Sequence, residues 1–462
     1  MLTFEIDKTI QDLAEYVASV SYADLTPDVV LAVKNRIVDT MGCGISCFNV
    51  EAAKIARQLA VPFESVPNAR IIGSLARTTP ECAAFANVLM CRYADFNDDF
   101  QWVGGGHVSD VISGILAAGE AFHANGKEFI TSVAIAYDVF CYFIERLQIR
   151  DRGWDHSIYV TLGTAIGAGK LLGLNREELC HCIALALVAN ICLDQARREE
   201  ISMWKAGAAG NASRQGLFAV FLARAGMTGP PGAIEGMNGF WNRVSGPFNF
   251  DYLVQPNKAS RILRTTIKQW PVRGGAQLPV ATALQLREKL NGERIRELRL
   301  ETYNRTVKYN QDPDQWAPKS KETADHSLPF CVASAIIYGE ITSDTFSSAR
   351  LVDPAILRLM GCMRVEENPQ FTKEFPSAQY CRMTAATERG NTVSVLLNWT
   401  DAERDKQRTR QSIEAKFNRL TKDFLTAEQR NAFINSVYAL DGLSDVASIL
   451  ENLKISEHEG AL

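Results

Sequence analysis

The sequence lacks the features that mark membrane, secreted and nucleic-acid-binding proteins. Its 462 residues contain no apolar run near the roughly 20 residues that a membrane-spanning helix needs. The first 17 residues, MLTFEIDKTIQDLAEYV, have no basic segment followed by an apolar one, so they do not resemble a secretory signal. Lys and Arg total 49 against 53 Asp and Glu, which leaves no basic excess for nucleic acid or an anionic membrane. We therefore expect a soluble, cytoplasmic or organelle-matrix protein whose partners include neither nucleic acid nor membrane.

Motifs for metals and nucleotide cofactors are also missing. The 11 cysteines are odd in number and scattered, which favours free thiols over a disulfide framework. Cys43 and Cys47 have no second pair at zinc-like spacing. Residues 180–182 read Cys-His-Cys within an apolar helical run, where adjacent side chains point in different directions. No GxGxxG or GxxxxGK[ST] motif occurs. The sequence therefore predicts neither a metal nor a nucleotide cofactor.

The pattern of apolar residues changes twice along the chain. Helical periodicity dominates to about residue 265, beginning with a helix that Thr26 caps and Pro27 opens. Alternating segments at 298–303 and 392–397 then predict strands, with helices at 279–289 and 331–338 between them. Helical patterns return near Arg404, over 413–425, 427–440 and 444–453. We predict a mainly α protein: a discontinuous all-α domain (1–265 and 404–462) and a smaller inserted α/β domain (266–403).

The segment from Arg92 to Asp110 carries the most unusual chemistry. Three carboxylates, Asp95, Asp98 and Asp99, lie within five residues, and such a cluster is either solvated or functional. Three glycines then lead to His107 at the start of an apolar helix. A carboxylate and a histidine suit general acid–base catalysis, whereas a solvated acidic loop beside a helix cap is the alternative.

Five further residues are open to two interpretations each. Lys205 begins a helix rich in small residues and is either an anion contact or an ordinary surface lysine. Lys268 and Arg273 lie near the predicted domain junction and are either an anion site or a pair of solvated cations. His326 and His156 follow short polar segments and are either proton-transfer groups or histidines beside helix caps and turns.

Taken together, these segments resemble the MmgE/PrpD family, which includes 2-methylcitrate dehydratase, cis-aconitate decarboxylase and iminodisuccinate epimerase. The resemblance runs through nearly the whole chain and rests on segments 38–43, 92–98, 107–110, 153–156, 170–174, 204–209, 226–230, 235–236 and 323–327. It implies a helical domain with an inserted α/β lid, a homodimer, and an active site between the domains that needs no cofactor. It also implies a small di- or tricarboxylate substrate.

The resemblance further implies roles for single residues. The expected catalytic residues are Asp95, His107, Lys205, His156 and His326, with Asp95 and His107 as the acid–base pair. The expected substrate-binding residues are Lys268, Arg273, Asp99 and Gln277, and no residue is expected to bind a metal. Removal of a proton beside a carboxylate creates negative charge, which fixed cations stabilise. Burial is expected to raise the pKa of Asp95 into a range useful for proton transfer.

Four positions depart from the family pattern. Relatives often carry Thr at Asp99, Pro at Val108, His at Gly275 and Tyr at Phe330. The leading hypothesis is a hydro-lyase that dehydrates 2-methylcitrate, citrate or a related hydroxy-polycarboxylate. The alternatives are a cis-aconitate-type decarboxylase or amino-dicarboxylate epimerase, and a family member that binds an organic acid without turnover.

Overall fold

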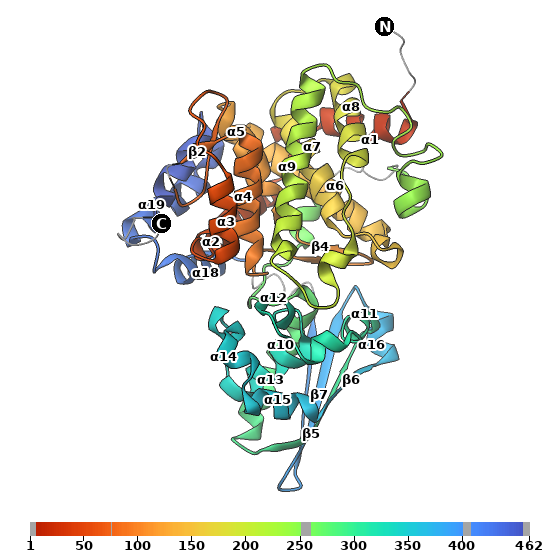
Figure 1. Cartoon of the computed structure of the whole chain (residues 1–462), viewed down its shortest axis with the longest axis vertical. Coiled ribbons are helices and arrows are strands. Elements are labelled where there is room, and N and C mark those ends of the chain that lie inside the picture. Colours follow the sequence, from red (N-terminus) through yellow and green to blue (C-terminus); the bar gives the residue numbers. More distant parts are fainter. Residues whose placement is uncertain (1–5, 75, 251–259, 401–407, 456–462) are drawn as a thin grey trace.

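The chain folds into a large helical body and a smaller part that contains a four-stranded sheet (Figure 1). This computed structural model describes residues 6–74, 76–250, 260–400 and 408–455. The protein is therefore mainly α, as its apolar periodicity predicts. None of the described helices combines the length and apolarity needed to cross a membrane.

The helical body contains the longer helices. They are α1 (Lys8–Ser19), α2 (Pro27–Ser46), α3 (Glu51–Leu59), α4 (Pro80–Tyr93), α5 (Ile112–Ala121), α6 (Gly126–Arg146), α7 (Ser157–Leu171), α8 (Arg176–Val188), α9 (Trp204–Arg224), α18 (Arg410–Thr421) and α19 (Ala427–Tyr438). Two short strand pairs lie beside them, β1 (Ala69–Arg70) with β2 (Arg77–Thr78) and β3 (Phe100–Gln101) with β4 (Gly105–Gly106).

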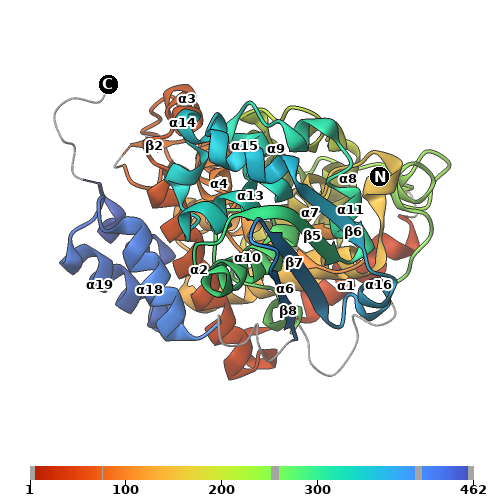
Figure 2. The same cartoon turned by 90° about the horizontal axis from the view of Figure 1, so that it is seen from below.

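Most helices of the smaller part are short. They are α10 (Gln277–Leu290), α11 (Asn304–Lys308), α12 (Lys321–Ala324), α13 (Leu328–Tyr338), α14 (Ser348–Leu351), α15 (Pro354–Gly361) and α16 (Pro369–Glu374). The strands are β5 (Ile295–Thr302), β6 (Met363–Glu367), β7 (Gln379–Thr387) and β8 (Thr392–Trp399). Figure 2, seen from below, shows this sheet lying across the helical body.

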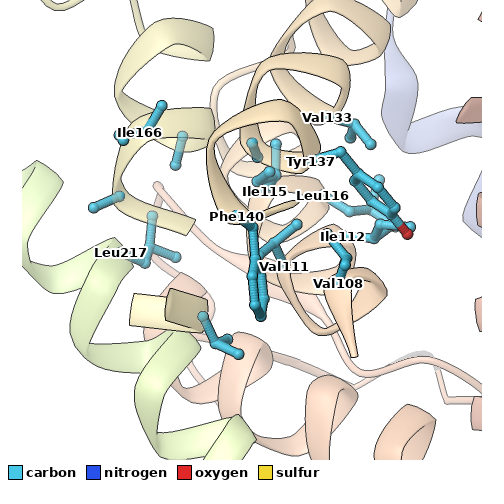
Figure 3. Packing of buried hydrophobic residues seen from close by; sticks show 14 of the residues in the cluster. Val108, Val111, Ile112, Ile115, Leu116, Val133, Tyr137, Phe140, Ile166 and Leu217 are labelled. Atoms are coloured by element: carbon cyan, nitrogen blue, oxygen red, sulfur yellow. The ribbon is translucent and has the colours of Figure 1, made fainter. Parts of the chain in front are cut away.

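Helices α5, α6 and α7 pack closely at the centre of the body. Figure 3 shows Ile115 of α5 beside Phe140 of α6 and Ile166 of α7. Gly167 of α7 has no side chain, and a Cβ there would overlap Ile115. The missing side chain at Gly167 therefore lets α7 approach α5 closely. Val108, the residue that follows His107, is also buried here.

The C-terminal helices complete the core that the N-terminal helices begin. Phe417 of α18 and Phe433 of α19 are fully buried in the same hydrophobic cluster as α2 and α6. A second cluster contains residues 272–395 only. The two clusters therefore draw on different parts of the chain, and the predicted domain boundary at 403/404 lies outside the described residues.

The sheet has the order β6-β5-β7-β8, and only β5 and β6 are parallel. Leu300 of β5 pairs with Met383 of β7, which pairs with Val395 of β8, and all three are buried. Helix α10 packs on β7 and β8, so one face of the sheet is covered while alternate residues face solvent.

Sequence patterns predicted β5 and β8 but not β6 or β7. The inward residues of β7 are Gln379, Cys381, Met383, Ala385 and Thr387. Small and polar side chains dominate this buried face, so the expected alternation of large apolar residues is absent. Residues 180–191 are almost wholly apolar, a pattern typical of a buried helix, but α8 ends at Val188, and Ile191 is 77% exposed.

We predict that Gly126→Ala destabilises the protein by about 1–3 kcal/mol through overpacking. Gly126 opens α6 and its backbone N–H donates to Leu443 O at 2.9 Å. A Cβ at this position would overlap the carbonyl oxygen of Leu440, so the C-terminal segment would have to move away. The midpoint of urea unfolding, followed by circular dichroism, measures the effect.

Gly361→Ala provides the matched control. Gly361 ends α15, and a Cβ there would meet no atom within 4 Å. The alanine should raise helix stability by about 0.5–1 kcal/mol. Equal midpoints for the two variants would contradict the tight docking of the C-terminal segment on α6.

Candidate active site

A polar cavity of about 570 Å³, including solvent at its mouth, lies where the two hydrophobic clusters meet. Five arginines, three histidines and one aspartate line it. The helical body contributes Arg92, Asp99, Gln101, Gly105, Gly106, His107, Arg150, His156 and Arg197, and the smaller part contributes Arg273, Gly274, Gly275, Arg305, Thr306, Tyr309 and His326. This composition favours an anionic ligand.

Asp95 is a buried carboxylate behind the cavity wall. It follows α4 with a φ of 51°, a left-handed conformation that few non-glycine residues adopt. Its Oδ1 lies 3.0 Å from Arg92 NH1 and 2.5 Å from Lys268 Nζ. Burial acts to raise the pKa of Asp95, but Arg92, Lys268 and the nearby histidines outweigh it and hold the pKa well below its usual value. The expectation of a raised pKa is therefore wrong, and Asp95 stays ionised.

Asp325 orients His326 at the end of the short helix α12. His326 Nδ1 lies 2.5 Å from Asp325 Oδ1 and must donate, because the carboxylate can only accept. Burial and the charge of Lys205 lower the pKa of His326 to about 4, although Asp95 and Asp325 oppose the shift. The imidazole is thus neutral at pH 7, with its unprotonated Nε2 3.3 Å from Asp95 Oδ2.

His107 approaches Asp95 on the other carboxylate oxygen. Its Nδ1 donates to the backbone oxygen of Asp98 at 2.8 Å, so Nε2, 3.3 Å from Asp95 Oδ1, is the unprotonated nitrogen. Burial lowers the pKa of His107 well below its usual value, and the charges of Arg92 and Lys268 act in the same direction. Asp95 therefore has one imidazole on each oxygen.

His156 lies beside His107, with the ring centroids 5.7 Å apart. His156 Nδ1 lies 2.8 Å from Arg150 NH2, which can only donate, and 3.1 Å from Asp155 Oδ2, which can only accept, so these contacts do not fix which ring nitrogen carries the proton. His156 Nε2 is buried and has no hydrogen-bond partner among the described residues. Burial lowers the pKa of His156 to about 4, although Asp155 opposes the shift. His156 is thus a neutral imidazole in the cavity wall.

Besides Asp95, three predicted residues do not line the cavity. Lys205 is fully buried and donates to both oxygens of Asp325, at 2.7 and 2.9 Å. Lys268 is fully buried and binds Asp95, and the amide of Gln277 binds backbone groups of residues 269, 270 and 272. Both lysines therefore form ion pairs with buried carboxylates. Gln277 instead holds the backbone segment that leads to Arg273.

Arg273 and Arg305 are the cavity cations without an anionic partner. Neither guanidinium has a carboxylate within 4.0 Å anywhere in residues 6–74, 76–250, 260–400 and 408–455. Arg273 Nε is buried without a hydrogen-bond partner, and its guanidinium carbon lies 5.2 Å from the Tyr309 ring centroid. Arg305 NH1 donates to Trp102 O at 2.7 Å and also to Gly104 O. Both guanidiniums keep their full charge available to a ligand.

Asp99 lines the cavity and is 3% exposed. Its two oxygens each lie 2.8 Å from Gln101 Nε2. Burial raises the pKa of Asp99, although Lys268 opposes the shift. Of the nine predicted residues, five line the cavity (Asp99, His107, His156, Arg273 and His326), and Asp95 contacts two of those five.

Sequence reasoning missed Arg150, Arg305 and Asp325. Asp325 immediately precedes the predicted His326, and a carboxylate beside a histidine was a usable signal. Arg150 and Arg305 lie in segments without a distinctive pattern, and only folding brings them to the cavity.

The residues present fit a bound metal poorly. Asp95, Asp325 and His326 could offer three ligand atoms within 4.8 Å of one another. However, Arg92 and Lys268 already pair with Asp95, and Lys205 and Lys321 pair with Asp325. A divalent cation there would be surrounded by four positive charges.

Comparison with known proteins agrees with the family resemblance. Residues 11–253 match the MmgE/PrpD N-terminal domain and residues 270–441 match the MmgE/PrpD C-terminal domain. The chain is 26% identical to a 2-methylcitrate dehydratase of Cupriavidus necator, over 80% of this chain and 79% of that protein. It is 24% identical to the 2-methylcitrate dehydratase of Escherichia coli K12 over 87% and 84% of the two chains.

A relative with a different reaction matches over an even larger share of the chain. The human cis-aconitate decarboxylase is 25% identical over 96% of this chain and 94% of that protein. The two domain matches together span both hydrophobic clusters and the cavity between them. This chain therefore belongs to the MmgE/PrpD family.

Proposed function

We propose that the protein is a lyase, a hydro-lyase that dehydrates citrate, 2-methylcitrate or a related hydroxy-polycarboxylate without a cofactor. The observation that carries this proposal is the neutral imidazole of His326, oriented by Asp325, in a cavity with two unpaired arginines. The names of the relatives support the same reaction class, since several are 2-methylcitrate dehydratases. The expected homodimer stays a prediction.

Arg273 and Arg305 bind carboxylates of the substrate in this proposal. An arginine presents paired N–H donors that match the two oxygens of a carboxylate. Because neither arginine pairs with a carboxylate of the described chain, substrate does not have to displace an internal anion. His156 adds a neutral imidazole whose Nε2, without a hydrogen-bond partner among the described residues, can contact a hydroxyl of the substrate.

His326 removes the proton from the carbon beside a carboxylate. Its unprotonated Nε2 accepts this proton, and the imidazolium that forms lies 3.3 Å from the Asp95 carboxylate. Asp325 stabilises the same positive charge through Nδ1. A bound polycarboxylate also adds negative charge to the cavity, which raises the basicity of the imidazole when substrate is present. His107, on the other oxygen of Asp95, can hold a second proton.

We predict that the pure protein produces a conjugated alkene from citrate or 2-methylcitrate. Dehydration places the new double bond beside a carboxylate, so ultraviolet absorbance should rise with time, and mass spectrometry should show loss of water. Boiled protein is the control. An unchanged absorbance with these acids would contradict the hydro-lyase, and release of carbon dioxide from cis-aconitate would instead indicate a decarboxylase.

We predict that His326→Gln lowers kcat by about 100- to 10,000-fold, because the variant has no general base. KM should change little, since His326 is not a carboxylate-binding cation. In the wild type, the pKa of His326 is lowered from 6.5 to about 4, so the base is active above this pH. The kcat/KM of the wild type should therefore fall as pH decreases through about 4.

His123→Gln is the matched control for this variant. His123 is exposed, its Nδ1 lies 2.8 Å from Asp445 Oδ2 at the protein surface, and it does not line the cavity. It should leave kcat and the pH profile unchanged. A His326→Gln enzyme with wild-type kcat would remove His326 from the mechanism.

We predict that Arg273→Gln raises KM by about 10- to 100-fold, the loss expected for a charged hydrogen bond to a carboxylate. The kcat should fall less, because Arg273 binds substrate rather than moving a proton. Steady-state kinetics with the best acid of the assay measure both constants. Arg364→Gln, which changes an arginine 72% exposed on β6, is the control and should leave KM unchanged.

A further inference from the structure

We propose that Asp99 is a catalytic residue, the general acid that protonates the hydroxyl as it leaves the substrate. This inference rests on the proposed dehydration and adds the second proton transfer that the reaction requires. A hydroxide ion is a poor leaving group, so a proton must reach its oxygen as the carbon–oxygen bond breaks.

The charge environment of Asp99 differs from that of the other carboxylates at the site. Asp95, Asp155 and Asp325 each have at least two cationic side chains within 4.0 Å. Asp99 has none among the described residues, although five arginines line the same cavity. The charge of Lys268 acts on Asp99, but its ammonium group donates to Asp95 instead.

The backbone fixes the Asp99 carboxyl group within the cavity wall. Asp99 N–H donates to Thr266 O at 2.9 Å, and Thr266 N–H donates to Asp99 O at 2.7 Å. On the other side, a Cβ at Gly274 would overlap Asp99 Oδ2, so the absence of a side chain leaves room for the carboxyl. The carboxyl is therefore held at the junction of the two parts, in the same cavity as His326.

The groups that face Asp99 favour its protonated form on balance. Burial and the negative charge of Asp95 favour the protonated acid, whereas Lys268, Arg305 and the Gln101 amide favour the carboxylate. Burial is the largest of these influences, and the net pKa of Asp99 is raised. Tyr303, the other titratable neighbour, is neutral because burial raises its own pKa.

The two proton transfers balance. His326 Nε2 takes the proton from carbon, and the electron pair of the C–H bond forms the double bond. The carbon–oxygen bond breaks with its electrons, and the oxygen takes the Asp99 proton and leaves as water. Asp99 is then a carboxylate and His326 an imidazolium, and transfer of one proton through solvent restores both groups.

Asp99→Asn tests the assignment, because asparagine keeps the shape of the side chain but cannot supply a proton. Dehydration should fall by about 100- to 10,000-fold. The C–H proton should still exchange, so substrate recovered from D₂O should carry deuterium at or above the wild-type level. Mass spectrometry of substrate and product measures both rates, and thermal unfolding checks that the variant folds. Asp344→Asn, at an exposed residue of the smaller part, is the control.

The outcomes separate this inference from the proposed function. Retained exchange with lost dehydration supports Asp99 as the acid. Wild-type dehydration in Asp99→Asn, or loss of exchange together with dehydration in a folded variant, overturns it. If the wild-type protein neither dehydrates nor exchanges any of the acids, the proposed function itself fails, and the role of Asp99 fails with it.

Discussion

The ionised, fully buried carboxylate of Asp95 is the constraint on which the site depends. Removing such a charge from water costs on the order of several kcal/mol unless fixed cations compensate. Arg92 and Lys268 provide that compensation, and the left-handed backbone at Asp95 brings the carboxylate between them. His107 and His326 are oriented through Nδ1 by Asp98 O and Asp325, and each has its Nε2 3.3 Å from one oxygen of this carboxylate. Loss of either cation would leave the buried charge between the two imidazoles without full compensation.

The charges of the site are divided between two layers. Behind the cavity wall, three lysines form ion pairs with buried carboxylates. Asp325 pairs with Lys205 and Lys321, and Asp95 pairs with Lys268, so these lysines fix the geometry of the site rather than bind a ligand. In the wall, Arg273 and Arg305 keep their charge available. The cavity can attract an anion while its histidines stay neutral, because burial disfavours a protonated imidazole and Lys205, Arg92 and Lys268 act in the same direction.

Contacts between distant segments hold the loop that carries the carboxylates. Lys416 of α18 lies 2.7 Å from both Asp39 of α2 and the backbone oxygen of Phe96. Tyr137 of α6 donates to Asp98 at 2.8 Å, and Arg36 of α2 lies 3.4 Å from the same carboxylate. The acidic loop is therefore a buried structural element rather than a solvated surface loop, and the C-terminal helix contributes directly to the geometry of the site.

The sequence by itself determined the mainly α fold, the helices that Thr26 and similar caps begin, and the acidic segment with His107, because these depend on local periodicity and residue type. It missed β7, whose buried face is small and polar. Only the tertiary structure decided which charges face the cavity. Lys205 and Arg273 are both cations beside small residues in the sequence, yet one is paired with a buried carboxylate and the other is not. That difference arises from contacts between segments more than 100 residues apart, such as Lys205 with Asp325, which local patterns do not encode.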